Sequence, residues 1–279
     1  MTTLTLSGVA HAYALKTVLE AIDLSLDAGR ILAIVGPSGC GKTTLLHLAA
    51  GLLACQTGTL ANSFVRPAVM FQTPRLLPWK TTRDNIALGL RAIGLPRAEW
   101  QMRAQAMGHA VGLDAAALDR FPHQLSGGMQ SRAALARALV LEPDLLLLDE
   151  PFSALDIGLK AQLHRLLLDH QAARQVAVLM ITHDLMEAVR LADTILVMAP
   201  APGRIAYRFE LSVAALLRDD GFVHRTTAQL LQAGVVRECF GLESLAPPAA
   251  DGDCPKVGAG GTAQVFDISR PAGKKGFAC

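Results

Sequence analysis

The sequence is poor in aromatic residues and charges, and it has no long hydrophobic run. Only 5% of its 279 residues are aromatic and 18% are charged, whereas 51% are hydrophobic, which excludes a disordered chain and allows a substantial core. Its longest apolar runs, such as 145–148 and 195–199, are far shorter than the roughly 20 residues of a membrane-spanning helix. Residues 1–6 lack the basic and apolar segments of a signal peptide. We therefore expect a folded protein that stays in the cytosol.

Close cysteine pairs and blocks of charge are also absent from the sequence. The 5 cysteines are odd in number and none forms a C-x-x-C pair, which argues against a disulfide framework and a zinc site, so we expect free thiols. The formal net charge is +2, and Lys and Arg are spread along the chain. This distribution favours neither a nucleic-acid footprint nor a polybasic membrane anchor.

What the sequence does contain is an alternation of strand and helix patterns. Apolar runs typical of strands buried on both faces lie at 31–35, 68–71, 145–148, 176–181 and 194–198. Helices are predicted from residue 42 and over 158–174 and 184–191. Strands that alternate with helices imply a parallel sheet with crossover connections. Alternating apolar residues in 4–6 and 22–26 predict an antiparallel edge, and 82 to about 112 is predicted as an inserted helical lobe.

The C-terminal part changes in composition. Residues 204–211 are expected to form a last strand, and 220–240 a single amphipathic helix. From 246 to 279 the chain is dominated by Ala, Gly and Pro without apolar periodicity, so we predict a flexible segment there. The predicted organisation is one domain over 1–240, with a helical subdomain at about 73–140, and a flexible tail over 241–279.

The first chemical motif directly follows the predicted strand 31–35. It fits G-x-x-x-x-G-K-[ST], the P-loop, and consists of Gly36, Pro37, Ser38, Gly39, Cys40, Gly41, Lys42 and Thr43. Glycines let backbone N–H groups surround phosphates at a helix N-terminus, Lys42 neutralises the β- and γ-phosphates, and the Thr43 hydroxyl binds Mg²⁺. Thr44 is counted with the nucleotide-binding residues. A glycine-rich turn without a ligand is the alternative, and the flanking strand and helix argue against it.

A second motif supplies the acidic groups that a magnesium-bound triphosphate needs. The apolar strand 145–148 ends in Asp149 and Glu150, which is the Walker B pattern. We expect Asp149 to hold Mg²⁺, because magnesium keeps several waters and accepts few protein oxygens. Glu150 is then expected to act on the attacking water as a general base or orienting group. Alone, such a pair is commonly a solvated strand end. Its occurrence together with the P-loop favours the Walker B interpretation.

A third motif points to a particular family. Leu125-Ser126-Gly127-Gly128-Met129-Gln130 resembles the LSGGQ signature of the ATP-binding cassette (ABC) family. Its physical interpretation is an anion site, with Ser126 as the N-cap of a helix and two glycines that expose their amides. The fold class that we expect is therefore α/β, a P-loop NTPase cassette with a mixed or parallel sheet core, an antiparallel β edge and an inserted helical subdomain.

The resemblance covers about residues 1–240 and implies roles for further residues. Gln72 resembles the glutamine that senses Mg²⁺ and the γ-phosphate, and Ser153-Ala154-Leu155-Asp156 resembles the D-loop that couples two sites through Asp156. His183 resembles the switch histidine at the γ-phosphate, and Tyr13 the aromatic residue that stacks on adenine. The implied catalytic residues are Glu150, His183 and Gln72, and the implied Mg²⁺ ligands are Thr43, Gln72 and Asp149.

The family also implies how the chain assembles. Residues 126–128 are expected to contact the γ-phosphate that the P-loop of another subunit holds. Because the sequence has one P-loop and one signature, an ATP sandwich requires two chains, and a homodimer is the simplest arrangement. ATP and Mg²⁺ are the expected cofactors, and a separate transmembrane permease and, indirectly, a solute-binding protein the expected partners. The expected location is peripheral, at the cytoplasmic face of the cell membrane, with no nucleic-acid partner.

The cargo is indicated by a short segment after Gln72. Residues 76–79 (LLPW) and 82–86 (TRDNI) resemble the nitrate, sulfonate and taurine importer branch. We expect an ATP hydrolase that energises uptake of a small anion of that kind. The alternatives are the ATPase of an exporter or of a transporter for another cargo, and a soluble ABC ATPase outside transport. Cys40 lies near a helix N-terminus, so its pKa is expected to be lowered and its alkylation to block activity.

Overall fold

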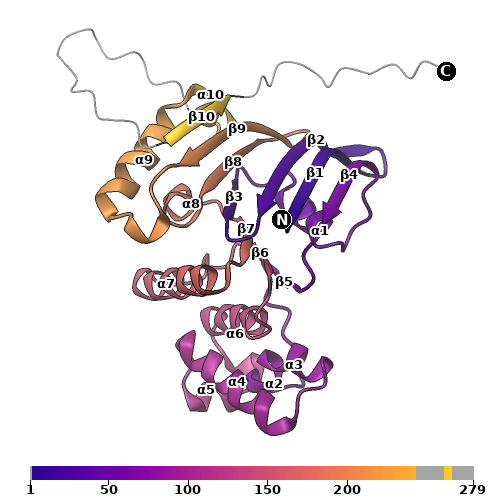
Figure 1. Cartoon of the computed structure of the whole chain (residues 1–279), viewed down its shortest axis with the longest axis vertical. Helices are drawn as coiled ribbons and strands as arrows, with labels where there is room; N and C mark the ends of the chain where they lie inside the picture. Colours follow the sequence, from indigo (N-terminus) through magenta and orange to yellow (C-terminus); the bar gives the residue numbers. More distant parts are fainter. Residues whose placement is uncertain (1, 243–260, 266–279) are drawn as a thin grey trace. The chain divides into compact units, whose positions relative to one another are not determined.

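The computed structural model describes residues 2–242 and 261–265, which form two compact units (Figure 1). Of the described residues, the first unit contains 2–4, Leu26–Ile31 and Asn62–Ile181. The second contains Thr5–Ser25, Leu32–Ala61 and the described residues from Thr182 onward. Each unit therefore combines segments that are far apart in the sequence.

The sheet strands of the first unit run parallel and are deeply buried. Strand β6 (Leu145–Asp149) pairs on one side with β5 (Pro67–Met70) and on the other with β7 (Ala177–Ile181). All residues of β6 and β7 are buried, as their unbroken apolar sequences predict. Helix α7 (Ile157–Arg174) is the crossover between them, and the register sets Asp149 opposite Ile181.

The rest of the first unit is largely the predicted helical lobe, drawn in magenta in Figure 1. Its helices are α2 (Thr82–Ile86), α3 (Leu88–Ala92), α4 (Arg97–Ala110), α5 (Ala115–Asp119) and α6 (Gly127–Leu139), with a 3₁₀ turn at Pro122–Gln124. The helical pattern of 82–112 is thus divided among short helices. Gly94, at φ 81°, and Pro96 separate α3 from α4, because neither residue favours a helix interior.

The second unit contains two sheets. In one, β3 (Ile31–Val35) pairs parallel with β8 (Thr194–Ala199), which pairs antiparallel with β9 (Arg204–Leu211). The other has the strand order β2 (Lys16–Asp27), β1 (Thr3–Tyr13), β4 (Thr57–Asn62), the predicted edge. The helices are α1 (Lys42–Ala49), α8 (Leu185–Leu191), α9 (Asp220–Gln232) and α10 (Gly234–Cys239), with a 3₁₀ turn at Ala215–Leu217.

Two expectations for the C-terminal part need correction. The single helix predicted over 220–240 is two helices, because Ala233 adopts an extended conformation between α9 and α10. Within the predicted flexible tail, β10 (Gly261–Val265) pairs antiparallel with β9, so main-chain hydrogen bonds order a segment without apolar periodicity. Residues 243–260 and 266–279 lie outside the described residues.

Candidate nucleotide-binding site

The P-loop connects β3 to α1 in the second unit, as predicted. Gly39 and Gly41 have φ values of 79° and 96°, which L-residues with a side chain rarely adopt. A Cβ atom at Gly41 would lie 2.7 Å from Cδ2 of Leu19, whereas one at Gly39 would meet nothing within 4 Å. The loop is therefore closed on the side of β2 and open at Gly39. This is the shape that a cradle for phosphates needs.

Lys42 concentrates positive charge in this cradle. Its Nζ donates hydrogen bonds to the carbonyl oxygens of Gly36 and Pro37, both at 2.8 Å, and the residue is only 8% exposed. The first turn of α1 contains no acidic residue. The ammonium group and the helix N-terminus thus add to a positive potential at the loop. Ser38, Gly39 and Thr43 are exposed, and Thr44 is half-buried.

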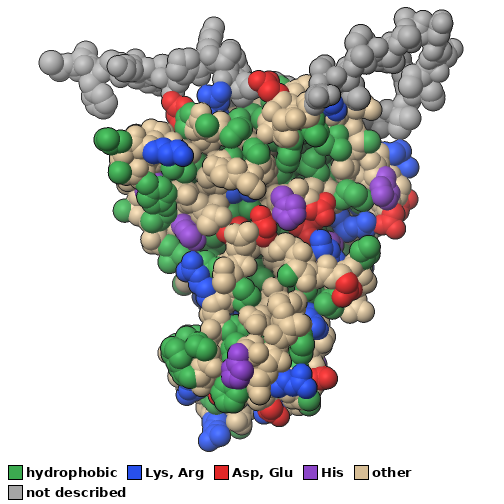
Figure 2. Space-filling model, turned by 180° about the vertical axis from the view of Figure 1, so that it is seen from behind, with side chains coloured by type: hydrophobic (Ala, Val, Ile, Leu, Met, Phe, Trp, Pro, Cys, Tyr) green, Lys and Arg blue, Asp and Glu red, His purple; other side chains and the backbone are tan. Residues whose placement is uncertain are grey.

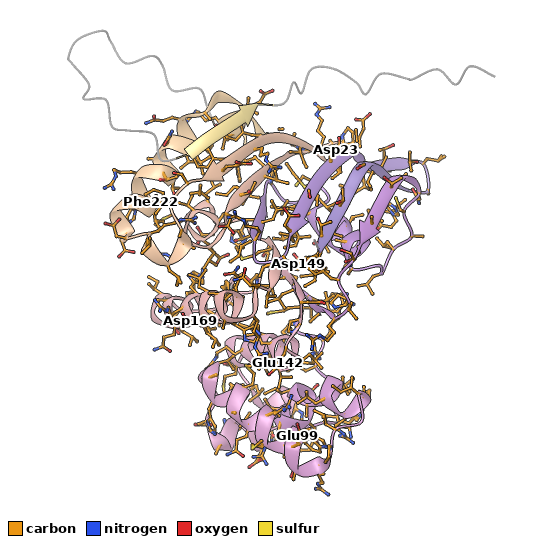
Figure 3. The ribbon with its side chains drawn as sticks, viewed as in Figure 1. Asp23, Glu99, Glu142, Asp149, Asp169 and Phe222 are labelled. Atoms are coloured by element: carbon orange, nitrogen blue, oxygen red, sulfur yellow. The ribbon has the colours of Figure 1, made fainter. Side chains whose placement is uncertain are left out.

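The Walker B residues belong to the first unit, and Asp149, which is labelled in Figure 3, ends β6. Asp149 is 2% exposed and Glu150 follows it at φ 48°, in the left-handed region. The Glu150 N–H donates to the carbonyl of Ile181 at 2.9 Å. A non-glycine residue in this conformation costs of the order of 1 kcal/mol, and such strain is concentrated at functional sites.

The structure brings Gln72 and Glu150 together. Nε2 of Gln72 donates a hydrogen bond to Oε2 of Glu150 at 3.3 Å, although the residues are 78 positions apart. Both belong to the first unit. The predicted glutamine and the predicted general base therefore share one hydrogen bond.

Sequence reasoning missed the residue that anchors the segment after Gln72. Arg137, on α6, donates to the carbonyl oxygens of Pro74 at 2.7 Å and Arg75 at 2.9 Å. Burial lowers the pKa of Arg137, because the guanidinium is removed from water. Arg75 in turn places its guanidinium 4.2 Å from the ring centroid of Phe71. Helix α6 thus fixes the segment that carries Gln72. No local sequence pattern predicts such a long-range contact.

The signature residues begin α6 as expected. Ser126 is the N-cap, and its Oγ accepts a hydrogen bond from the N–H of Met129 at 3.3 Å. A Cβ at Gly127 would meet nothing within 4 Å, whereas one at Gly128 would lie 3.1 Å from the carbonyl oxygen of Ala154. Gly128 therefore lies beside the predicted D-loop, where Asp156 caps α7 by accepting from the N–H of Leu159 at 3.0 Å.

Comparison with known proteins decides the family. Residues 19–153 match the family described as ABC transporter. The chain is 43% identical to the taurine import ATP-binding protein TauB of Escherichia coli O157:H7, over 74% of this chain and 84% of that protein. It is 42% identical to the aliphatic sulfonates import ATP-binding protein SsuB of Corynebacterium glutamicum, over 82% of this chain and 92% of that protein. The chain belongs to the ABC transporter family.

A solved structure agrees with membership of the ABC transporter family. The chain is similar to the dimeric post-hydrolysis structure of the ATP-binding cassette MJ0796 bound to ADP and Pi, with a TM-score of 0.67 and 26% sequence identity. The similarity covers 72% of this chain and 96% of that one. The predicted fold, a P-loop NTPase cassette, and the predicted enzyme class, an ABC-type ATPase, are therefore confirmed. The roles of individual site residues stay predictions.

The remaining predicted residues of this ABC cassette lie in the second unit. Tyr13 ends β1 and is 49% exposed, with its ring edge-to-face against His11 at a centroid distance of 4.9 Å. An exposed ring that is fixed at one edge suits stacking on a base. His183 is exposed between β7 and α8, and the side chain of its neighbour Asp184 caps α8.

The expected lowering of the Cys40 pKa is wrong, whereas the effect of its alkylation on activity stays a prediction. The thiol is buried, and burial raises its pKa despite the opposing effect of the Lys42 ammonium group. Desolvation disfavours the thiolate, which is the nucleophilic form, and it outweighs the nearby positive charge. The helix N-terminus therefore does not make this an activated cysteine.

A prediction follows for alkylation. Iodoacetamide at pH 7.5 is expected to modify exposed Cys55 at least about tenfold faster than Cys40, because a buried thiol with a raised pKa provides little accessible thiolate. Peptide mass spectrometry over time measures both rates in one sample. Equal rates at the two sites would contradict the burial of Cys40.

Proposed function

We propose that this chain is the ATP-binding and ATP-hydrolysing subunit of an ABC importer for a small organic anion of the sulfonate type. The observation that carries the proposal is the 43% identity to a taurine import ATP-binding protein over 84% of its length. The P-loop geometry supports it, because Lys42 and the open face at Gly39 provide a phosphate cradle.

The chain's own residues divide the chemistry among them. We propose that Lys42 and the loop amides bind the phosphates, that Tyr13 stacks on adenine, and that His183 contacts the γ-phosphate. Glu150 accepts the proton of the attacking water, and Gln72 orients Glu150 through their hydrogen bond. Binding at a helix N-terminus orients the triphosphate, and water activation at Glu150 then supports hydrolysis.

Magnesium fits this set of residues. Residues 2–242 and 261–265 contain no group of three or more acidic, His or Cys side chains that could hold a metal ion. Mg²⁺ does not need such a group, because it binds one or two carboxylates, substrate phosphates and waters. We propose Thr43, Asp149 and Gln72 as the protein groups that hold it. When bound, Mg²⁺ neutralises charge that develops on the phosphate oxygens.

We further propose that two copies of the chain form the working unit. The sequence has one P-loop and one signature, and in each chain Gly127 is open to an incoming group. The signature of one copy then contacts the nucleotide that the P-loop of its partner holds, in an isologous arrangement. Closure around ATP does work because the closed state binds ATP more tightly than the open one.

The permease is proposed to dock on the helical lobe, at the cytoplasmic face of the membrane. Exposed apolar side chains are frequent there, and Figure 2 shows hydrophobic atoms at the surface of this lobe. The exposed large apolar side chains of the lobe are Trp79, Leu88, Ile93, Met102 and Phe121. Apolar patches of this kind mark protein interaction sites. No helix in the described part of the chain is long and apolar enough to cross a membrane.

Copurification from the native host tests the proposal. Gently solubilised membranes from cells with a tagged chain are expected to yield a multispanning permease, and deletion of the gene is expected to abolish uptake of labelled taurine or an alkanesulfonate while labelled phosphate uptake continues. If a permease copurifies without a solute-binding protein, and deletion of the gene leaves sulfonate uptake intact, an exporter or another cargo is favoured. Recovery with soluble proteins only, from a chain with intact ATPase activity, would refute the transport function.

A further inference from the structure

The turn between β8 and β9 lies against the P-loop, although about 160 residues separate them in the sequence. Within the second unit, the Gly203 N–H donates to the carbonyl of Val18 at 2.8 Å, and the Gly203 carbonyl accepts from the Glu20 N–H at 2.9 Å. These two bonds join the turn to β2 as a parallel bridge opposite Leu19. Two main-chain hydrogen bonds therefore hold Gly203 in place.

Gly203 also contacts the backbone of the P-loop. A Cβ atom at this position would overlap the carbonyl oxygen of Cys40 and would lie 3.1 Å from its carbonyl carbon and 3.0 Å from the carbonyl oxygen of Val18. All three atoms belong to backbone that is held in place, so no flexible side chain can move away. Only glycine fits between β2 and the loop here.

Two further glycines of the loop lie against β8 and β2. A Cβ at Gly36 would lie 2.7 Å from the carbonyl oxygen of Met198, at the end of β8. A Cβ at Gly41 would lie 2.7 Å from Leu19 and 3.2 Å from Val18, on β2. The loop is thus packed on its inner side against β2, the end of β8 and the β8–β9 turn, while Gly39 stays open on the other side.

This packing determines where an amide points. The peptide unit that joins Cys40 to Gly41 is planar and trans, so its C=O and N–H groups point in opposite directions. Because the Cys40 carbonyl points toward Gly203, the Gly41 N–H points away from the turn. A contact at Gly203 therefore orients a backbone donor of the loop, and Lys42 follows directly in the chain.

We propose that Gly203 is a positioning residue for nucleotide binding, which aims the Gly41 amide at the phosphates by supporting the Cys40 carbonyl. The inference rests on the proposed binding of ATP at the P-loop. It makes a specific claim about chemistry: the contact serves triphosphate recognition and is independent of the adenine base.

The test is Gly203→Ala, compared with Gly234→Ala. A Cβ at Gly234 would meet nothing within 4 Å and its φ is not positive, so this control adds the same methyl group in open space. In Gly203→Ala the affinities for ATP, ADP and inorganic triphosphate, measured by calorimetry, are expected to fall by the same factor of about tenfold or more, because the added methyl group displaces the Cys40 carbonyl and turns the Gly41 amide away from a charged phosphate. Gly234→Ala is expected to bind like the wild type.

A merely structural role predicts a different result. In that case Gly203→Ala lowers the melting temperature but the folded protein binds all three ligands within about twofold of the wild type, and the inference is overturned. A wild-type protein that binds none of them instead refutes the proposed ATP binding itself. If Gly203→Ala does not fold, hydrogen exchange on the wild type decides: slower exchange of the Gly203 and Glu20 amides with inorganic triphosphate supports the inference, and unchanged exchange overturns it.

Discussion

Replacing Glu150 by glutamine is expected to stop ATP turnover and leave ATP binding intact. The amide has the same shape and still offers an oxygen to Nε2 of Gln72, which lies 3.3 Å from the carboxylate in the wild type. It cannot accept a proton from water, and loss of a general base typically costs 10²- to 10⁴-fold, so we expect kcat to fall by about 100-fold or more. Because hydrolysis reopens the proposed dimer, Glu150→Gln should accumulate as a dimer with ATP and Mg²⁺ on a sizing column.

Glu142 offers a matched control for this experiment (Figure 3). Like Glu150 it belongs to the first unit and has a positive φ, 50° against 48°. Its carboxylate instead forms an ion pair with Arg174 at 2.7 Å, with both side chains well exposed. Exposed pairs contribute about 0.2–1 kcal/mol, and this one has two hydrogen bonds of 2.7 Å, so Glu142→Gln is expected to lower stability by about 1 kcal/mol and to leave kcat unchanged. Turnover of Glu150→Gln at the wild-type rate would exclude Glu150 as the base.

The sheet strands and the P-loop are the features that the sequence predicts best. Continuous apolar runs such as 145–148 have one stable environment, the interior of a sheet covered on both faces, and the structure places them there. The P-loop is similarly local, because its glycines, its lysine and the start of α1 are consecutive in the chain. Where a structural requirement is met by neighbouring residues, the pattern of residue types suffices to predict it.

Helix ends and the structure of the tail are harder to predict from sequence, because contacts with distant segments determine them. The 220–240 segment has suitable periodicity for one helix, yet the chain turns at Ala233 to pack α10 against β8 and β9. The 261–265 segment has no apolar pattern at all and is ordered by pairing with β9. Main-chain pairing carries little sequence information, since every residue except proline provides the same donor and acceptor.

The same reasoning explains which parts of the site were missed. The hydrogen bond between Gln72 and Glu150 joins two predicted residues, but its existence depends on the parallel pairing of β5 and β6. Arg137 and Gly203 act through backbone atoms of distant segments, so their own sequence neighbourhoods look ordinary. The direction of the Cys40 pKa shift was predicted wrongly. Proximity to a helix N-terminus is visible in the sequence, whereas burial, which dominates this pKa, is not.

Replacing Lys42 by alanine is expected to weaken ATP binding strongly. The ammonium group is the positive charge that the P-loop surrounds, and it is fixed by two carbonyl oxygens at 2.8 Å. Hydrogen bonds to charged groups contribute about 1.5–3 kcal/mol, so loss of the contact to phosphate should weaken ATP binding by about 10- to 100-fold. Calorimetric titration with ATP and Mg²⁺ measures the change, and ATPase activity at cellular ATP concentrations should fall in parallel.

The loop itself should survive the loss of Lys42, which makes this prediction one about binding. In the wild type the lysine satisfies the Gly36 and Pro37 carbonyls, and water can reach them through the open side of the loop once the side chain is removed. Arg165→Ala is a suitable control, because it removes a positive charge from the exposed face of α7, where Arg165 pairs only with Asp169 on its own helix at 2.9 Å among the described ion pairs. That variant should bind ATP like the wild type. If Lys42→Ala bound ATP equally well, the P-loop would not be the phosphate site, and the geometry of Gly39, Gly41 and Gly203 would need another explanation.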